Sequence, residues 1–371
     1  MRATRAEISL PNLYHNLAHF RACLQPRVRL CLAVKGNAYG HGLSEISRRA
    51  AADSHVDSYA VATVEEGIAL RQAGIRQAIL LLSAHLKEEI PLLCQWELEP
   101  LISHSHYLSD YQREAARHKT TLRLHLKIDT GMSRAGALPA VAPAIAGAIQ
   151  RLDALKLNGI CTHFASADEE NPDQTQAQIQ CFNQVLSTLR EQNIPLPCIH
   201  AANSAATLRY PETHFDMVRI GIGAYGYSCE TLRPVMTLKS KIGLIKPVPR
   251  GAKVSYGGTW TAPRDSLLAL LPIGYADGYS RLLSNQGQVL LQGEPCPLVG
   301  RVSMDQIVID LTAWAAKRAV QREQLYEQDI ELFGSRITAQ DIARQVHTIP
   351  YEILTSISAR VPRVYLDNAD E

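Results

Sequence analysis

The sequence predicts an α/β protein in which an N-terminal (β/α)8 barrel of the TIM type precedes a mainly antiparallel β domain. Up to about residue 222, eight short β-rich runs alternate with helical stretches, which is typical of a parallel sheet closed into a barrel. After about residue 235 the apolar runs lie close together and are divided by Gly, Pro and Asp turns, which indicates antiparallel strands. The predicted domains are residues 1–233 and 234–371.

The first domain is expected to begin with a helix over residues 13–24. Leu13, Leu17, Phe20 and Leu24 recur there at helical spacing, with Asn12 as the N-terminal cap. Each predicted strand is a short apolar run that a helical stretch follows. The eight strands are expected at residues 30–35, 59–62, 78–82, 100–102, 122–128, 157–162, 198–202 and 217–222.

The second domain is expected to contain one helix among its strands. That helix begins at Thr338, because Asp341 three residues later completes a capping pair. No repeat or long linker separates the domains. The strands are expected at residues 242–248, 253–256, 267–273, 289–291, 299–309 and 330–333.

The composition is that of an ordinary soluble protein: 371 residues, 46% hydrophobic and 20% charged, with a formal net charge of +2. This balance gives no reason to expect nucleic acid or a membrane surface as a partner. The eight cysteines are scattered without a C-x-x-C pair, so neither a metal site nor a disulfide framework is expected. With no signal-like N-terminus and no apolar run of membrane-spanning length, a cytoplasmic protein is expected.

One lysine stands at the boundary between a strand and a turn. Lys35 follows the apolar run 30–32, and residues 36–42 contain three glycines together with Asn37 and Tyr39. From position alone, a solvated charge is the common interpretation. A lysine beside a Gly-rich turn can also form a Schiff base with a carbonyl cofactor, whose phosphate the turn contacts.

Polar residues gather at the ends of five predicted strands, where the active sites of barrel enzymes lie. Each has a structural alternative: His163 as a core histidine, Arg219 as half of an ion pair, Ser204 as a helix cap. Their recurrence at five strand ends nevertheless favours an active site. The residues are Lys35; Lys127, Asp129 and Arg134; His163; Asn203 and Ser204; and Arg219.

The loops after the seventh and eighth predicted strands have the features of a phosphate site. Ser204 offers a hydroxyl and opens a helical stretch whose first amides favour an anion. Gly221 and Gly223 allow close approach of the backbone, and Tyr39 could add a phenol from the first loop. A Schiff-base lysine beside such a site is an arrangement for pyridoxal phosphate.

Residues 34–42, Val-Lys-Gly-Asn-Ala-Tyr-Gly-His-Gly, resemble the pyridoxal-phosphate motif VKANAYGHG of bacterial alanine racemases, a fold-type III family. The resemblance covers nearly the whole chain and includes residues 255–260, 274–278 and 300–305. It implies a pyridoxal-phosphate-dependent isomerase that interconverts L- and D-alanine, with the cofactor bound to Lys35, and that supplies D-alanine for peptidoglycan.

The resemblance also implies roles for individual residues. Lys35 and Tyr256 would be the two catalytic bases, although composition alone favours Tyr256 as a core aromatic. Arg219 would bond the pyridine nitrogen with His163 behind it, and Arg134 would contact the cofactor's phenolic oxygen and the substrate carboxylate. Further implied residues are Tyr39, Asn203, Ser204, Gly221, Ile222 and Tyr351 for the cofactor, Met304 for the substrate, Lys127 and Asp305 for support, and Asp168, Tyr275, Arg281 and Ile349 for an entrance corridor.

A head-to-tail homodimer is a further implication of the resemblance. Each barrel would be closed by the partner's β domain, so that Tyr256, Met304 and Asp305 act together with Lys35 of the other chain in one active site. The departures from the family motifs are Gly36 in place of alanine, Ser133 at a variable position and Ser303 where many members have cysteine. None removes a group that the mechanism needs.

Three alternatives stand beside this interpretation. A barrel decarboxylase would place a carboxylate at the pyridine nitrogen, and the basic Arg219 argues against it. Single-barrel proteins that carry the cofactor without turnover lack a second domain with a residue such as Tyr256. A racemase acting on serine or on a broad set of amino acids remains open.

Overall fold

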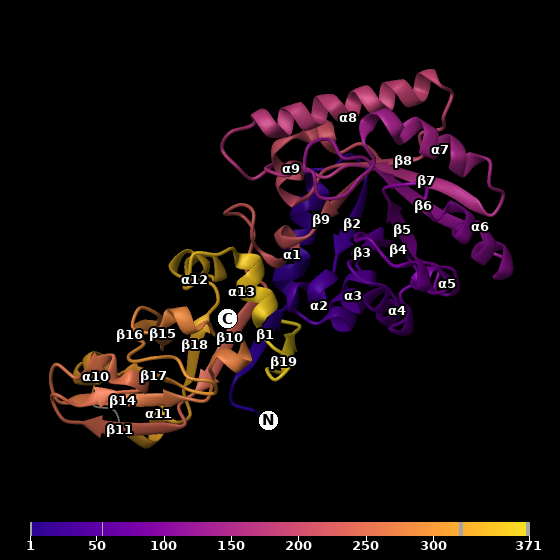
Figure 1. Ribbon diagram of the computed structural model, residues 1–371. Helices are drawn as coiled ribbons and strands as arrows, with labels where there is room; N and C mark the ends of the chain where they lie inside the picture. The colour runs from indigo at the N-terminus through magenta and orange to yellow at the C-terminus, as the bar shows by residue number, and fades with distance from the viewer. Residues whose placement is uncertain (1, 54, 319–321, 369–371) are drawn as a thin grey trace.

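The computed structural model describes residues 2–53, 55–318 and 322–368, which form a barrel and a second, β-rich part (Figure 1). In the barrel, strands 2 to 9 pair in order and close between β9 and β2, and every pair is parallel. The predicted eight-stranded barrel is therefore confirmed. Its strands are β2 (Arg29–Ala33), β3 (Ser58–Val61), β4 (Ala78–Leu81), β5 (Glu99–Ile102), β6 (Leu122–Lys127), β7 (Leu155–Cys161), β8 (Cys198–His200) and β9 (Met217–Ile220).

Helices surround the barrel, and the long α8 crosses its outer surface (Figure 1). The first helix begins earlier than predicted and has a different cap, because the Ser9 hydroxyl accepts the amide of Asn12 at 3.3 Å. Asn12 instead donates its side-chain amide to the carbonyl of Pro234 at 2.8 Å, which fastens this helix to the connection between the two parts. The helices are α1 (Leu10–Ala22), α2 (Lys35–Tyr39), α3 (Leu43–Ala51), α4 (Val64–Gln72), α5 (Ile90–Gln95), α6 (Leu108–Arg117), α7 (Ala142–Gln150), α8 (Asp173–Glu191) and α9 (Ser204–Arg209).

The second part contains a six-stranded sheet, a three-stranded sheet and a two-stranded ribbon, in the orders β16-β15-β18-β10-β1-β19, β11-β14-β17 and β12-β13. All pairs are antiparallel except that of β1 with β19, which agrees with the predicted mainly antiparallel domain. The strands are β1 (Arg5–Ser9), β10 (Met236–Lys241), β11 (Leu244–Val248), β12 (Lys253–Val254), β13 (Trp260–Thr261), β14 (Ser266–Leu271), β15 (Gln288–Leu291), β16 (Glu294–Pro297), β17 (Ile307–Asp310), β18 (Asp329–Phe333) and β19 (Arg363–Leu366).

The chain crosses between the two parts more than once. Strand β1 lies in the six-stranded sheet and passes directly into α1 of the barrel. Buried apolar residues of both parts form one continuous core, which includes Ile8 on β1, Leu13 on α1 and Leu238 on β10. The two parts therefore pack as one body, in agreement with the absence of a long linker from the sequence.

Several strands of the second part differ from the prediction. Strands β1, β10, β13, β16 and β19 were not predicted, and β17 covers only the end of the predicted run 299–309. The predicted strand 253–256 ends at Val254, because the chain then enters a 3-10 turn, Tyr256–Gly258. Short strands such as β1 exist because distant segments pair with both of their edges, which the local sequence does not specify.

The remaining α-helices belong to the second part, and the last of them packs against α2 at the mouth of the barrel. They are α10 (Thr312–Ala316), α11 (Arg322–Leu325), α12 (Ala339–Gln345) and α13 (Pro350–Ser356). The predicted cap of α12 is confirmed, because Thr338 and Asp341 form a reciprocal capping box. Helix α13 packs on α2 so closely that a Cβ on Gly40 would lie 2.1 Å from the carbonyl oxygen of Leu354. Among the described residues, no helix has both the length and the hydrophobicity needed to cross a membrane.

Candidate active site

Lys35 lies at the C-terminal end of β2, where the backbone makes a left-handed turn. The residues Gly36, Asn37 and Ala38 have φ/ψ of 63/44, 57/46 and 54/52 degrees, and Tyr39 follows with φ of 52 degrees. Left-handed geometry costs an L-residue roughly 1–2 kcal/mol. Such strain persists only where the surroundings enforce it, and it clusters at functional sites.

Hydrogen bonds from two directions hold this turn. The Asn37 side chain accepts the amide of Leu43 at 2.8 Å, and its carbonyl accepts the amide of Gly42 at 2.9 Å. On the other side, Glu66 accepts the amide of Gly36 at 2.7 Å. The departure of Gly36 from the family's alanine suits its positive φ, and a Cβ there would meet only Thr355, at 3.5 Å. An alanine would therefore fit, at a conformational cost of roughly 1 kcal/mol.

The surroundings of Lys35 favour its neutral amine. Burial is the main reason that the pKa of Lys35 is lowered from its ordinary value, and the positive charges of Arg134 and Arg219 lower it further. The carboxylate of Glu66 acts in the opposite direction. A lysine with a lowered pKa at a barrel mouth has the properties of a nucleophile or general base.

Tyr39 lies at the end of the turn, among aromatic rings from both parts of the protein. Its ring stacks on Tyr225 with centroids 4.8 Å apart, and the ring of Tyr351 from α13 lies at 5.9 Å. The phenol oxygen approaches Gly221 so closely that a Cβ at that position would lie 2.3 Å from it. The absence of a side chain at Gly221 therefore leaves room for the phenol of Tyr39.

Ser204 and Gly221 meet in a buried corner beside Tyr39. The Ser204 hydroxyl oxygen accepts the amides of Gly221 and Gly223 at 3.0 and 3.2 Å. The alternative that Ser204 caps a helix is wrong, because Asn203 caps α9 by accepting the amide of Ala206 at 3.0 Å.

This corner fits a phosphate. Ile222 begins a 3-10 turn, Ile222–Tyr225, whose first amides have no partner within the turn. The Ser204 hydroxyl, the Tyr39 phenol and the amide of Ile222 thus gather where the sequence predicted an anion, and these donors suit a phosphate ester.

Arg219 reaches from β9 into the centre of the barrel, where the guanidinium is 6% exposed. Its Nη2 donates to the carbonyls of Thr162 and Ala201, both at 2.8 Å, and lies 3.1 Å from Nδ1 of His163. Its Nη1 donates to Nδ1 of His200 at 2.7 Å. The contacts among described residues use neither Nε–H nor the second proton of Nη1, so donors remain for a ligand. The alternative that Arg219 pairs with a carboxylate is wrong within the described chain.

His163 stays neutral beside this guanidinium. Burial and the charges of Arg219, Lys127 and Arg134 hold its pKa well below the ordinary value. The structural alternative for His163, a hydrogen-bonded core histidine, is compatible with its expected place behind Arg219, because the same contact with Arg219 serves both.

Lys127 and Arg134 stand on either side of a tightly folded loop after β6. One carboxylate oxygen of Asp129 accepts the amides of Gly131, Met132 and Ser133 at 3.0, 3.1 and 3.0 Å. Lys127 is 7% exposed, and burial is the main cause of its lowered pKa, with Arg134 and Arg219 adding to it. Arg134 itself is exposed at the mouth.

Tyr256 projects into solvent from the second part of the protein. It begins the turn Tyr256–Gly258 and is 70% exposed, so the interpretation as a core aromatic is wrong. The turn is anchored by the Ser255 hydroxyl, which donates to the carbonyl of Arg301 at 2.7 Å. None of the hydrogen bonds, ion pairs or ring contacts among the described residues connects Tyr256 with Lys35.

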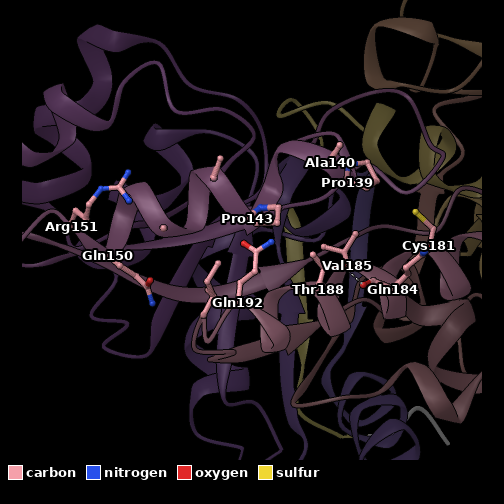
Figure 2. A pocket seen from close by; sticks show the side chains of 13 residues that line it. Pro139, Ala140, Pro143, Gln150, Arg151, Cys181, Gln184, Val185, Thr188 and Gln192 are labelled. Carbon is pink, nitrogen blue, oxygen red and sulfur yellow. Dashed lines mark hydrogen bonds between the residues drawn. The ribbon is translucent and has the colours of Figure 1, made fainter.

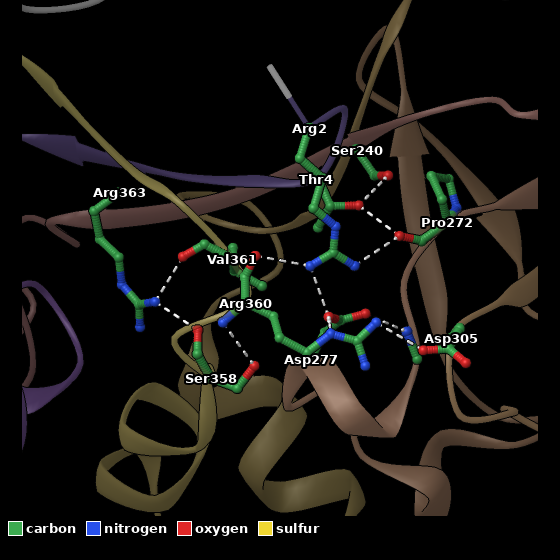
Figure 3. A network of polar contacts seen from close by, with 11 residues as sticks. Arg2, Thr4, Ser240, Pro272, Asp277, Asp305, Ser358, Arg360, Val361 and Arg363 are labelled. Carbon is green, nitrogen blue, oxygen red and sulfur yellow. Dashed lines mark hydrogen bonds and ion pairs between the residues drawn. The ribbon is translucent and has the colours of Figure 1, made fainter.

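Met304 and Asp305 are exposed, as Tyr256 is, and hydrogen bonds hold the backbone of their loop. The carbonyl of Met304 accepts the amide of Ala276 at 3.0 Å, and Arg360 binds Asp305 at 2.7 Å (Figure 3). The fully buried carboxylate of Asp277 pairs with Arg2 at 2.8 Å and with Arg360 at 3.4 Å. Because Arg360 also binds Asp305, it links the loop of Met304 and Asp305 to Asp277, and Arg2 links Asp277 to the N-terminal segment. The loop is therefore rigid although the Met304 side chain is 52% exposed.

The residues expected to form an entrance corridor are also exposed. Tyr275 and Ile349 are 43% and 57% exposed, and Arg281 and Asp168 lie on the surface. Burial and the nearby charge of Asp168 raise the pKa of Tyr351 to about 12. The single chain thus brings together the barrel residues and Tyr351, while Tyr256, Met304, Tyr275 and Ile349 present open surface.

Sequence reasoning missed Glu66, His200 and Tyr225. Glu66 could have been found from the capping box that it forms with Thr63 at the start of α4. His200 ends β8 as His163 follows β7, which was a comparable signal.

A separate hollow of about 950 Å³ lies on the outer ring between α7 and α8 (Figure 2). It combines Pro139, Pro143 and Val185 with polar side chains such as Gln184 and Arg151, and it includes the single thiol of Cys181. It lies outside the barrel wall and shares no residue with the mouth.

Fold and site together define an enzyme of the (β/α)8-barrel class in which a lysine of lowered pKa, an anion-binding corner and a buried arginine share the barrel mouth. Comparison with known proteins makes this more specific. Residues 8–229 match the profile described as "Alanine racemase, N-terminal domain", and residues 235–365 match "Alanine racemase, C-terminal domain". The chain belongs to the alanine racemase family, and the predicted enzyme class, a pyridoxal-phosphate-dependent amino-acid racemase, is confirmed.

Individual relatives are similar over their full length. The alanine racemase of Treponema denticola is 41% identical over 99% of each chain, and that of Halothermothrix orenii is 40% identical over 98% of this chain and 97% of its own. Among solved structures, an alanine racemase of Clostridium difficile 630 is 34% identical with a TM-score of 0.92, covering 99% of this chain and 97% of that one. The Bartonella henselae alanine racemase, with covalently bound pyridoxal phosphate, is 26% identical with a TM-score of 0.88, covering 99% and 100%.

Proposed function

We propose that the protein interconverts L-alanine and D-alanine by a two-base mechanism in which Lys35 and Tyr256 exchange protons on opposite faces of the substrate Cα. The observation that carries the proposal is the half-buried Lys35 amine, with its lowered pKa, held by a strained turn beside a corner suited to phosphate. A base works best when its pKa lies near the working pH, and burial moves Lys35 in that direction.

The residues at the mouth fit pyridoxal phosphate. Lys35 would hold its aldehyde carbon, and Tyr39, Ser204, Gly221, Ile222 and Tyr351 would surround its phosphate, with Asn203 fixing the helix start. When bound, the cofactor supplies a conjugated ring that withdraws electrons from the substrate Cα. Arg219 would donate an N–H to the ring nitrogen without transferring its proton, because a guanidinium stays protonated in proteins.

The substrate carboxylate has two proposed partners. Arg134 is exposed at the mouth and would pair with it, while Lys127 and Asp129 shape the loop behind Arg134. The backbone amide of Met304 would complete the carboxylate site. Asp168, Tyr275, Arg281 and Ile349 would line the approach, and Asp305 would hold the Met304 loop through Arg360.

The active unit is proposed to be a homodimer. Tyr256 and Met304 are exposed by 70% and 52% in the single chain, so a partner's mouth is a suitable place for them. Within each chain we propose domains 1–233 and 234–371, with β1 lending a strand to the second. All eight cysteines are free thiols, which supports a cytoplasmic protein. Supply of D-alanine for peptidoglycan is the proposed role.

The test is a chiral assay of the purified protein with L-alanine, L-serine and L-lysine. We expect D-alanine to be the main product. Additional formation of D-serine, even if slower, would favour the broader racemase. Borohydride treatment should fix the cofactor on Lys35 and fail to do so in Lys35→Ala. Absence of D-alanine from a protein that carries cofactor would overturn the proposal.

A further inference from the structure

A chain of buried side chains leads from Arg219 through the centre of the barrel. Nη1 of Arg219 lies 2.7 Å from Nδ1 of His200, and Nε2 of His200 lies 2.9 Å from Nδ1 of His125. Nε2 of His125 then lies 3.0 Å from Oε2 of Glu99. The exposed fractions of His200, His125 and Glu99 are 0%, 2% and 3%, so no solvent bond replaces these contacts.

The direction of every hydrogen bond in this chain is fixed by Arg219. A guanidinium only donates, so Nδ1 of His200 must accept and its proton must lie on Nε2. That proton points at His125, whose Nδ1 must therefore accept, which places its proton on Nε2. There the acceptor is Glu99, an ionised carboxylate that only accepts. One assignment of protons satisfies all three contacts.

The barrel wall is shaped to admit His125. Strand β6 has an irregular register at this point, where the partners shift between Leu124 and His125, and the partner of His125 on β7 is Gly159. A Cβ on Gly159 would lie 2.0 Å from Nδ1 of His125. Any other residue at position 159 would displace the imidazole from the chain.

Glu99 keeps its charge at the far end of the barrel. Although burial raises its pKa, the hydrogen bond from His125 and the charge and hydrogen bond of Arg123 act against it, and the pKa of Glu99 is lowered from its ordinary value. Nε of Arg123 donates to Glu99 at 2.6 Å, and the Asn158 amide donates at 2.9 Å. A carboxylate buried in a barrel core is costly unless it is paired in this way.

We propose that His125 and Glu99 are positioning residues for racemisation. They hold the proton of His200 on Nε2, so that its Nδ1 stays an acceptor and fixes the orientation of the guanidinium of Arg219, which would donate to the cofactor's ring nitrogen. The inference rests on the proposed role of Arg219, and its first test involves no turnover.

The first test is 15N NMR of the cofactor-loaded protein labelled at histidine. Signals are assigned from His200→Gln and His125→Gln. Both residues are expected as neutral Nε2–H tautomers. A proton on Nδ1 of His200, or a doubly protonated His125, would overturn the proposal. A protein that showed these tautomers but formed no D-alanine would contradict the proposed racemase function, but not the proposed role of His125 and Glu99.

The second test compares His125→Phe with His125→Gln. Phenylalanine keeps an aromatic ring but bonds neither neighbour, whereas glutamine retains a donor and an acceptor. We expect His125→Phe to lower kcat about tenfold or more, with KM for alanine near that of the parent protein and an altered absorption spectrum of the bound cofactor. His125→Gln should recover most of kcat and the parent spectrum. Equal losses in both variants with an unchanged spectrum would indicate packing alone and overturn the proposal.

Two further variants keep the test decisive. Glu99→Leu, with a side chain of similar volume and no acceptor for Nε2–H of His125, serves if His125→Phe does not fold, and it should change the cofactor spectrum in the same direction. His214→Phe is the matched control, because it removes another buried histidine, bonded to the carbonyl of Thr207 at 2.8 Å, outside the chain. It should lower the melting temperature and leave the spectrum unchanged. A spectral change with His214→Phe and none with Glu99→Leu would overturn the proposal.

Discussion

The amide of Gly36 donates a hydrogen bond to Oε1 of Glu66 at 2.7 Å, directly beside Lys35. The other oxygen of Glu66 accepts the amide of Ala62 at 2.8 Å, so one carboxylate joins the end of β3 to the left-handed turn. Burial and Arg134 lower the pKa of Lys35, and the charge of Glu66 opposes them. Glu66 therefore fixes the geometry of the lysine while restraining the shift of its pKa.

Glu66→Gln separates these two effects. The amide oxygen can still accept from Gly36, but the charge that raises the pKa of Lys35 is gone. We expect the pKa of Lys35 in the cofactor-free protein to fall further, so that the neutral amine persists to lower pH. The measurement is the rate of cofactor attachment against pH, whose midpoint should move down. Glu65→Gln, an exposed neighbour, is the control, and an unchanged or higher midpoint in Glu66→Gln would contradict the prediction.

Tyr256→Phe should remove one proton exchange and leave cofactor binding intact. A general acid–base group contributes roughly 10²–10⁴-fold, so kcat should fall within that range. Because Tyr256 faces one enantiomer, exchange of the Cα proton with solvent deuterium should be impaired more for that enantiomer. Tyr326→Phe, which alters another exposed tyrosine outside the site, is the control. Small and equal losses with both enantiomers would indicate that Tyr256 only packs at the mouth.

The barrel was predictable because its strands are buried on both faces. Residues such as those of β4, Ala78–Leu81, form continuous apolar runs that stand out in the sequence whatever their partners. Strand β1 was not predictable in this way. Arg5 and Glu7 alternate with Ala6 and Ile8, and the segment becomes a strand because β10 and β19 pair with its two edges.

The residues of the site differ in the same way in how far they could be predicted. Lys35, Ser204 and Arg219 lie at or just after the C-terminal ends of barrel strands, so the barrel topology brings them together. The left-handed turn and the histidine chain behind Arg219 depend on contacts between side chains far apart in sequence, such as His125 with His200. The exposure of Tyr256 could not be predicted from the sequence. A tyrosine on a β-rich segment is typical of a buried core, but the turn Tyr256–Gly258 places this one in solvent.

Arg219→Glu should change the electronic character of the cofactor. A carboxylate at the ring nitrogen favours its protonated form, which makes the ring a stronger electron sink. We expect slower racemisation and, in the presence of alanine, a new absorption band at long wavelength. Arg219→Lys, which keeps a positive charge, should not produce that band. An unchanged spectrum of Arg219→Glu under substrate would show that residue 219 does not address the ring nitrogen.

Lys127 is predicted to carry a carbamate. Its lowered pKa increases the neutral amine at neutral pH, and only the neutral amine adds carbon dioxide. The product is an anion that would orient Arg134. With 13C-labelled bicarbonate, a carbamate 13C signal is expected that disappears in Lys127→Ala and fades as the pH falls and the amine protonates. Electron density for an unmodified ammonium with no anion nearby would refute the prediction.

The homodimer can be tested by mixing two inactive variants. Lys35→Ala lacks one base and Tyr256→Ala lacks the other, so each should be inactive alone. If the site is shared, a mixed dimer contains one complete site, with Lys35 from the Tyr256→Ala chain and Tyr256 from the Lys35→Ala chain. Co-expression should then restore activity, up to half of that of the parent for each mixed dimer.

The alternative makes the opposite prediction, because no mixed dimer contains both bases in one chain if each chain builds its own site. A mixture as inactive as its components would exclude a shared site, provided that differently tagged chains co-purify and so prove that mixed dimers form. The control pairs Lys35→Ala with Arg219→Ala, two residues of the same barrel. With a shared site, that mixture should be no more active than the Arg219→Ala protein alone, because either barrel lacks a residue that the partner's β domain cannot replace. Recovery with Tyr256→Ala and none with Arg219→Ala would therefore assign Tyr256 alone of these residues to the partner's site.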